Sequence, residues 1–267
     1  FCRVLSTLMW RDFLNIKRNP KLFVARIFQA TVIGLVGGAV FWKLSDDYSD
    51  PSLSSKSFAS KNGALFYFSV AQFFAAFSAS LLTFPTEKPV FLKEQSNKMY
   101  SVFAYFLSRN IMELLMTYIG PTLYTLIVYW MMNLRSGASH FFMCLLITLM
   151  VSFAGNSYGL MISSFFNSQK VVAGMVPTVA LTFIAFSGYF KNRKDIPGWL
   201  VWINYLSPIK YSFIAYAKNE YSNTSAPIES LGFELSLAQS LVLLLVISLS
   251  ARIIAFIVLS LSKAKLQ

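Results

Sequence analysis

Apolar residues recur along this chain in runs that are long enough to cross a bilayer. A spanning helix needs about 20 predominantly apolar residues. Segments of about that length or more lie at 22–42, 63–84, 102–134, 141–166, 171–190 and 237–261. The third run is longer than one crossing requires, so its first turns are expected to extend into the cytosol. The pattern predicts an all-α, polytopic membrane protein with six transmembrane helices.

Two further segments have aromatic and apolar residues but no uninterrupted span. In residues 6–20, Leu8 and Phe13 fall at helical spacing among charged residues, which favours an amphipathic helix in the membrane interface. The alternative is a soluble helix of an upstream domain. Residues 191–236 hold tryptophans and tyrosines broken by Pro197 and Pro208. This pattern predicts an outer re-entrant helical segment, covered by protein where its backbone is irregular, followed by a loop.

The composition supports a membrane protein and limits its partners. Apolar residues make up 56% of the 267 residues and charged residues only 13%, whereas soluble domains carry roughly 25% charge. Mean hydropathy is +0.57. A net charge of +12 would suggest nucleic acid in a soluble protein. Here the basic residues stand between apolar runs, so membrane lipids with anionic head groups are the expected partner and nucleic acid is not.

The orientation follows from the loops. Basic residues outside the spans are slightly more numerous on the inner side if the N-terminus is cytosolic, as the positive-inside rule requires. The sequon Asn223-Thr224-Ser225 then lies outside, where Asn223 is a candidate for glycosylation. The pattern does not distinguish the plasma membrane from an internal membrane.

The connection between the second and third spans has the densest charge pattern. Charged and apolar side chains alternate at Glu87, Lys88, Phe91, Lys93 and Glu94. A short helix here would separate the charges from the apolar residues and suit docking of a soluble domain at the cytosolic face. The alternative is a solvated loop, in which Phe91 would be exposed to water.

Four charged residues lie within spans, namely Arg26, Arg109, Glu113 and Arg252, where charge is expensive and usually paired. Arg109 and Glu113 are four residues apart, so they share one helix face. They form either a polar relay between the cytosolic side and the bundle or a static ion pair. Arg252 in the last span is expected to extend toward the cytosolic interface.

Aromatic and small residues mark helix faces. Phe66, Phe73 and Phe77 share one face of the second span, with Phe74 adjacent. They would line a pocket for a flat apolar ligand or pack against lipid and neighbouring helices. Glycines four residues apart in the first and fourth spans, among them Gly155 and Gly159, favour close helix packing.

No catalytic or metal site is predicted. The chain contains no GxxxxGK[ST] phosphate loop, one histidine (His140) and two cysteines (Cys2 and Cys144), too few for a metal cluster or a nucleophilic set.

Three motifs in this order resemble the transmembrane domain of the G subfamily of ATP-binding cassette transporters, which includes White-type half-transporters and pleiotropic drug resistance pumps. They are FPTEKPVFLKE followed by Tyr100, AYFLSR and Glu113; FSGYF at 186–190; and IPGWLVWINYLSPIKYSF with Asn219-Glu220. The resemblance covers nearly the whole length. It implies a single ABC-2 type transmembrane domain over residues 1–267.

The resemblance also implies partners. Two such domains pair, as a homodimer or a heterodimer, around a central cavity. A nucleotide-binding domain, upstream on the same polypeptide or separate, would bind ATP and Mg, and this chain would bind no cofactor itself. A start at Phe1 rather than Met accords with an upstream domain. The connection from Glu87 to Tyr100 would contact that domain and is called the coupling region below.

Site roles follow from the same resemblance. The substrate cavity is expected at Phe73, Phe74, Phe77, Leu181 and Ile184. The gate between the inner cavity and the outer exit is expected at Tyr189 and Phe190. That gate is often leucine in the family, so its shape would differ here.

The sequence therefore predicts the membrane half of an ATP-driven exporter of lipids, sterols or other hydrophobic amphiphiles. The chain has no ATPase site, while the full protein is expected to be an ATP-coupled translocase. The alternative is a non-transporting binding or regulatory module that pairs with another half-transporter.

Overall fold

In the computed structural model, the described residues (2–18, 20–44, 51–97, 99–190, 197–222 and 235–264) are helical, with short connections and no strand. The sequon at Asn223 and the parts of segment 191–236 that fall at 191–196 and 223–234 lie outside them. The helices are α1 (Cys2–Arg18), α2 (Lys21–Val40), α3 (Pro51–Ser96), α4 (Val102–Met131), α5 (Ala138–Phe165), α6 (Gln169–Ala185), η2 (Gly198–Leu200), α7 (Val201–Leu206), α8 (Pro208–Glu220) and α9 (Leu237–Ala264).

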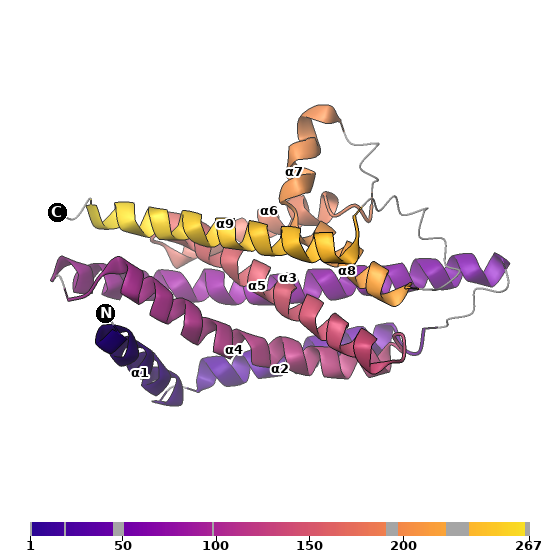
Figure 1. The fold of residues 1–267 in the computed structure, drawn as a ribbon, viewed down its shortest axis with the longest axis horizontal. Coiled ribbons are helices and arrows are strands. Elements are labelled where there is room, and N and C mark those ends of the chain that lie inside the picture. Colours follow the sequence, from indigo (N-terminus) through magenta and orange to yellow (C-terminus); the bar gives the residue numbers. More distant parts are fainter. Residues whose placement is uncertain are drawn as a thin grey trace.

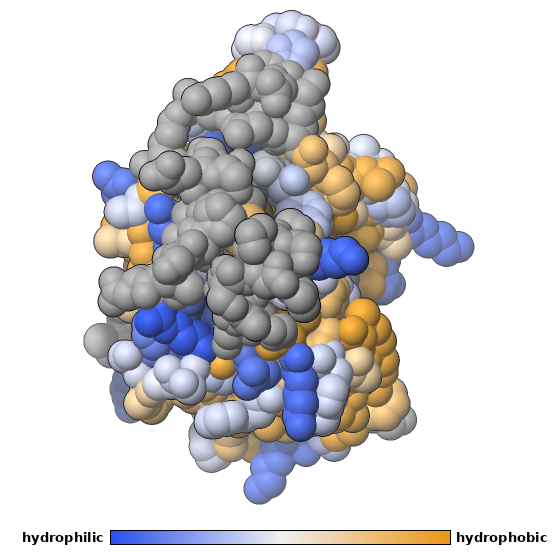
Figure 2. Space-filling view, turned by 90° about the vertical axis from the view of Figure 1, so that its right-hand side faces the viewer, coloured by the Kyte–Doolittle hydropathy of each residue, from blue (hydrophilic) through white to orange (hydrophobic). Residues whose placement is uncertain are grey.

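The long helices run side by side, with both chain ends at one end of the bundle (Figure 1). We call this end the inner end. α5 packs against α3, α4, α8 and α9, while α2 packs mainly on α4. α1 lies beside the inner part of α4, and α7 stands off the bundle toward the other end. Figure 2 looks onto this other end, which we call the outer end, and shows apolar residues on the side of the bundle.

The predicted spans are confirmed as helices, with different bounds. Within the described residues, five helices are long and apolar enough to cross a membrane, and α6, with 17 residues, is shorter. α3 is the largest departure, because it runs unbroken for 46 residues through Pro85 and Pro89. The expected short helix of the charged connection is thus the last part of α3. Packing of Phe84 and Phe91 in a buried cluster with α4, α5 and α9 holds these turns together, which outweighs the helix-breaking tendency of proline.

The described part of the predicted re-entrant segment is helical and broken at Ser207; α7 is largely exposed, whereas the break and α8 are covered by protein. Nearly all of α8 is buried. Around the break at Ser207, side chains satisfy backbone carbonyls: Ser207 Oγ donates to Phe183 O at 3.1 Å, and Tyr158 Oη donates to Leu206 O at 2.9 Å. Because irregular backbone in a membrane must be satisfied by protein, these bonds explain how α7 and α8 are tolerated there.

A buried polar cluster closes the outer end. Lys61 of α3 was expected in an outer loop, but it is only 2% exposed. Its Nζ lies 2.5 Å from the Glu220 carboxylate at the end of α8. The same carboxylate accepts the backbone N–H of Arg135, at 3.1 Å to each oxygen. The C-terminal end of α8 is thereby fixed to α3 and to the α4–α5 connection.

Candidate functional site

Glu94, near the end of α3, joins three helices at the inner end. Arg11 Nη1 of α1 donates to both of its carboxylate oxygens, at 3.0 and 3.2 Å. The Tyr100 hydroxyl, just before α4, donates to Glu94 Oε2. Burial and this bond to a carboxylate raise the pKa of the Tyr100 phenol above its ordinary value. A displacement of α1 would therefore be felt by α3 and α4 together.

The apolar side of the same segment faces inward. Phe91 is 1% exposed and stacks on Tyr105 of α4, with ring centroids 4.5 Å apart. Leu92 is half-buried and Lys93 is exposed. Phe91 and Lys93 thus differ in exposure as predicted, and the solvated-loop alternative is wrong because this segment is helical.

Lys88 does not lie on the exposed side. It is 4% exposed, and its Nζ donates to the carbonyl oxygens of Ser164 (2.7 Å) and Phe166 (3.4 Å), at the C-terminus of α5. A cation is favoured at the negative end of a helix dipole. The expectation that Lys88 meets a soluble domain is corrected, because capping α5 buries it.

Arg109 and Glu113 share a face of α4, with Nε and Oε2 3.8 Å apart. The structure adds two partners that the sequence pattern missed. Arg109 Nη1 pairs with Glu87 Oε2 at the inner part of α3, and Ser80 Oγ donates to Glu113 Oε1 at 3.1 Å. Since α3 continues past its predicted end, Glu87 comes beside α4. These contacts connect the inner part of α3, at Glu87, with Glu113 inside the bundle.

Arg252 was expected to extend toward the interface, but the structure shows otherwise. It is 7% exposed, and it donates to Ser157 Oγ at 2.9 Å and Asn156 Oδ1 at 2.8 Å on α5. Its guanidinium also lies 4.3 Å from the ring centroid of Phe153. Polar side chains of α5 thus hold Arg252 between α5 and α9.

The aromatic face of α3 is mostly internal. Phe73 and Phe77 are fully buried, and Phe73 meets Phe183 of α6 edge-to-face at 5.7 Å. Their expected role as ring faces open to a substrate is corrected, because α5 and α6 cover them. Phe74, half-buried, remains at the edge of this packing.

One face of α6 is uncovered in this chain. Only Val172 and Phe183 of this helix are buried. Leu181 is 69% exposed, whereas Ile184 packs against the core. Of the five residues expected in the cavity, Phe74 and Leu181 are therefore the more accessible.

The gate residues follow α6, which ends five residues before the predicted bound. Gly188 has φ of +85°, which favours glycine and turns the chain out of the helix. Asn204 Nδ2 of α7 donates to Phe186 O at 2.9 Å, which satisfies a carbonyl freed at this end. Tyr189 then stacks on Phe66 with ring centroids 4.4 Å apart, while Phe190 is 66% exposed.

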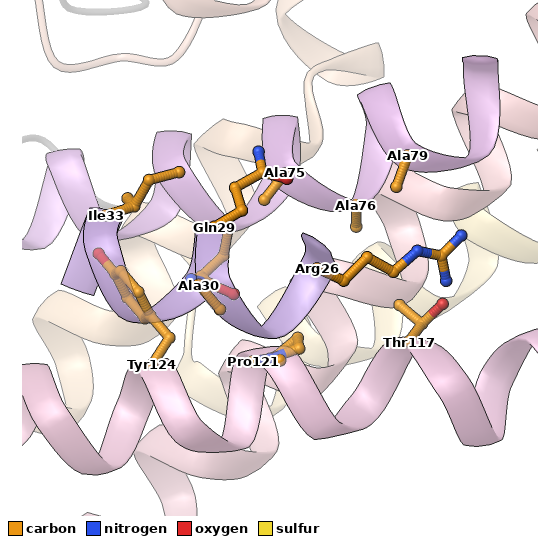
Figure 3. A pocket seen from close by; sticks show the side chains of 12 residues that line it. Arg26, Gln29, Ala30, Ile33, Ala75, Ala76, Ala79, Thr117, Pro121 and Tyr124 are labelled. Carbon is orange, nitrogen blue, oxygen red and sulfur yellow. The ribbon is translucent and has the colours of Figure 1, made fainter. Parts of the chain in front are cut away.

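A groove that the sequence pattern did not indicate lies between α2, α3 and α4 (Figure 3). It holds about 510 Å³ of space, part of it open to the surroundings. Small residues of α3 form one wall, and Arg26 of α2 and Thr117 of α4 face each other across it. Its residues come from three helices at spacings that no single-helix pattern reveals.

Known proteins are similar to this chain over most of its length. The profile of the ABC-2 type transporter family matches residues 3–221. Protein white of Drosophila melanogaster is 29% identical over 272 residues, covering 95% of this chain and 39% of that protein. Broad substrate specificity ATP-binding cassette transporter ABCG2 of Mus musculus is 31% identical over 225 residues, covering 83% and 33%. The chain thus spans well under half the length of these relatives.

Proposed function

The chain belongs to the ABC-2 type transporter family, and we propose that it is the membrane-spanning half of an ATP-driven exporter of lipids, sterols or other hydrophobic amphiphiles. The observation that carries this proposal is the uncovered apolar face of α6, on which Leu181 is exposed. An amphiphile held by apolar contact needs such a face. The names of its relatives, which include an ATP-binding cassette transporter of broad substrate specificity, support ATP-driven transport by the whole protein.

A second transmembrane half would cover this face. Leu181 is exposed on α6, and an uncovered apolar helix face marks either a lipid-facing surface or an interface. In a homodimer or a heterodimer, α3 and α6 of the two halves would enclose the substrate cavity. Tyr189 and Phe190, between the end of α6 and the re-entrant segment, would then close its outer exit.

Movement driven by ATP would be transmitted to this chain at the inner end of the bundle. With a cytosolic N-terminus, α1 and the last turns of α3 face a nucleotide-binding domain, which would bind ATP and Mg. The exposed Lys93 and Met99 are available for that contact. Glu94, held by Arg11 and Tyr100, would pass its movement to α4.

The test is the ATPase activity of the full-length protein that carries this chain, in lipid vesicles with added sterols, phospholipids or hydrophobic drugs. Stimulation by sterols or phospholipids is expected. A flat response from a folded, ATP-binding protein would overturn transport and favour a regulatory module. Stimulation by drugs alone would overturn the lipid assignment.

Phe74→Ala should weaken substrate binding by about 1–3 kcal/mol, the scale of burying one aromatic side chain. The measurement is the concentration of stimulating lipid that gives half-maximal ATPase activity. Phe28→Ala is the matched control, because Phe28 is 69% exposed on α2, away from α6. An unchanged response in Phe74→Ala would remove this ring from the site.

Glu94→Gln should uncouple the protein while leaving it folded. The Arg11–Glu94 pair is partly exposed, so its loss should cost no more than about 1 kcal/mol of stability. Substrate stimulation of ATP hydrolysis should fall several-fold, because the charged contact between α1 and α3 is lost. Lys56→Gln, at an exposed position near the opposite end of α3, is the control. Equal stimulation in the two variants would contradict the coupling role.

A further inference from the structure

Arg26 is the charged residue within the mostly apolar sequence that follows Lys21 in α2. It lies on α2, whose neighbouring residues Val24 and Phe28 are 58% and 69% exposed. Its side chain runs along the groove between α2, α3 and α4, toward Thr117 (Figure 3). The groove therefore places a guanidinium at the lipid-facing flank of the bundle.

Among the described residues, Arg26 makes no hydrogen bond and no ion pair within 4.0 Å. Intramembrane arginines are almost always paired. The nearest candidate is Glu113, but Ser80 already occupies one of its carboxylate oxygens and Arg109 lies at the other. Arg26 thus lacks the partner that its position requires.

Positive charge exceeds negative charge around Glu113, next to this groove. Arg26, Arg109 and Arg252 all lie within electrostatic range of Glu113. Glu87 forms an ion pair with Arg109. Arg26 and Arg252 carry the remaining positive charges near Glu113. Arg252 is enclosed by hydrogen-bond partners on α5. The excess positive charge is accessible at Arg26.

The groove has room for an aliphatic chain beside this charge. Ala75, Ala76 and Ala79 form its α3 wall, and Gly120 of α4 faces Ala30 of α2. Amide and hydroxyl groups also line it, from Gln29, Gln72 and Thr117. A guanidinium, hydroxyl and amide groups, and small apolar side chains together match the chemical groups of a glycerophospholipid.

We propose that this groove binds an anionic phospholipid of the adjoining leaflet, with its phosphate on Arg26 and an acyl chain along the alanines of α3. A guanidinium binds phosphate through paired charge-assisted hydrogen bonds. A sterol hydroxyl is neutral and would not balance the charge of Arg26. The site is distinct from the proposed substrate face, because its residues lie on α2, α3 and α4 whereas that face lies on α6.

The test is native mass spectrometry of the full-length protein in detergent, titrated with phosphatidylserine or phosphatidylcholine. The wild type should retain phosphatidylserine preferentially. Arg26→Gln should lower that preference about tenfold, which corresponds to about 1.4 kcal/mol, because the net negative charge of phosphatidylserine then loses its cationic partner, whereas phosphatidylcholine carries its own cation. Arg26→Lys should keep most of it.

Two alanine variants separate the groove from the general membrane surface. Ala79→Leu fills the space beside Arg26 and should reduce retention of both lipids. Ala25→Leu, at an exposed α2 position outside the groove, should behave as the wild type. Each variant is compared only as monodisperse protein. Unchanged preference in Arg26→Gln, or displacement of phosphatidylserine by equimolar cholesterol, would overturn the proposal.

Discussion

Lys61→Met should destabilise the protein by about 3–5 kcal/mol, the cost of breaking a buried ion pair by removing one partner. Both side chains of the Lys61–Glu220 pair are almost fully buried, at 2% and 4% exposure. Without the ammonium group, the Glu220 carboxylate loses its charged partner. The hydrogen bond from the backbone N–H of Arg135 remains. A buried carboxylate in that condition is poorly compensated.

The measurement is the fraction of full-length protein that stays monodisperse on size exclusion after heating. Lys56→Met is the matched control, because Lys56 is exposed on the same helix. Adding Glu220→Gln to Lys61→Met should restore much of the loss, since the orphaned charge is then removed. The ion-pair argument fails if Lys61→Met and Lys56→Met melt alike.

The fold was largely predictable because lipid exposure imposes long apolar runs, which sequence shows directly. The bounds were less predictable where tertiary contacts override local signals. The second span was predicted to end at residue 84, yet α3 continues through Pro85 and Pro89 to Ser96, with Phe91 buried. α6 ends early because Gly188 and the bonds from α7 stop it.

The polar sites were predictable only where both partners lie on one helix. The Arg109–Glu113 spacing follows from helix geometry. The partners from other helices, Glu87 and Ser80, do not. Lys88 and Arg252 were placed in water or at the interface because a single sequence does not reveal the carbonyls and side chains of α5 that receive them.

The aromatic stripe shows the same limit. Periodicity placed Phe73 and Phe77 on one face of α3, but it does not say which helix covers that face. Close approach of α5 decides this, and it buries both rings. The groove at Arg26 was missed for a related reason, since its walls come from three helices.

Close approach of α5 depends on glycine. A Cβ at Gly155 would overlap the carbonyl oxygen of Phe73, and a Cβ at Gly159 would lie 2.6 Å from the carbonyl oxygen of Phe77. Both obstacles are backbone atoms of α3, which cannot rotate away as a side chain can. The predicted small-residue pair in α5 is thus confirmed as a helix-packing contact.

Gly155→Ala should therefore destabilise the protein by an amount near the upper end of the roughly 1–3 kcal/mol that overpacking costs, although alanine has the better helix propensity. Heating followed by size exclusion measures this. Gly34→Ala is the control, because its Cβ would meet Tyr124 Cδ2 at 3.4 Å, an ordinary contact. Substrate stimulation should weaken as well in Gly155→Ala, because moving α3 also moves Phe74. Equal melting of the two alanine variants would show that α3 and α5 can separate without loss.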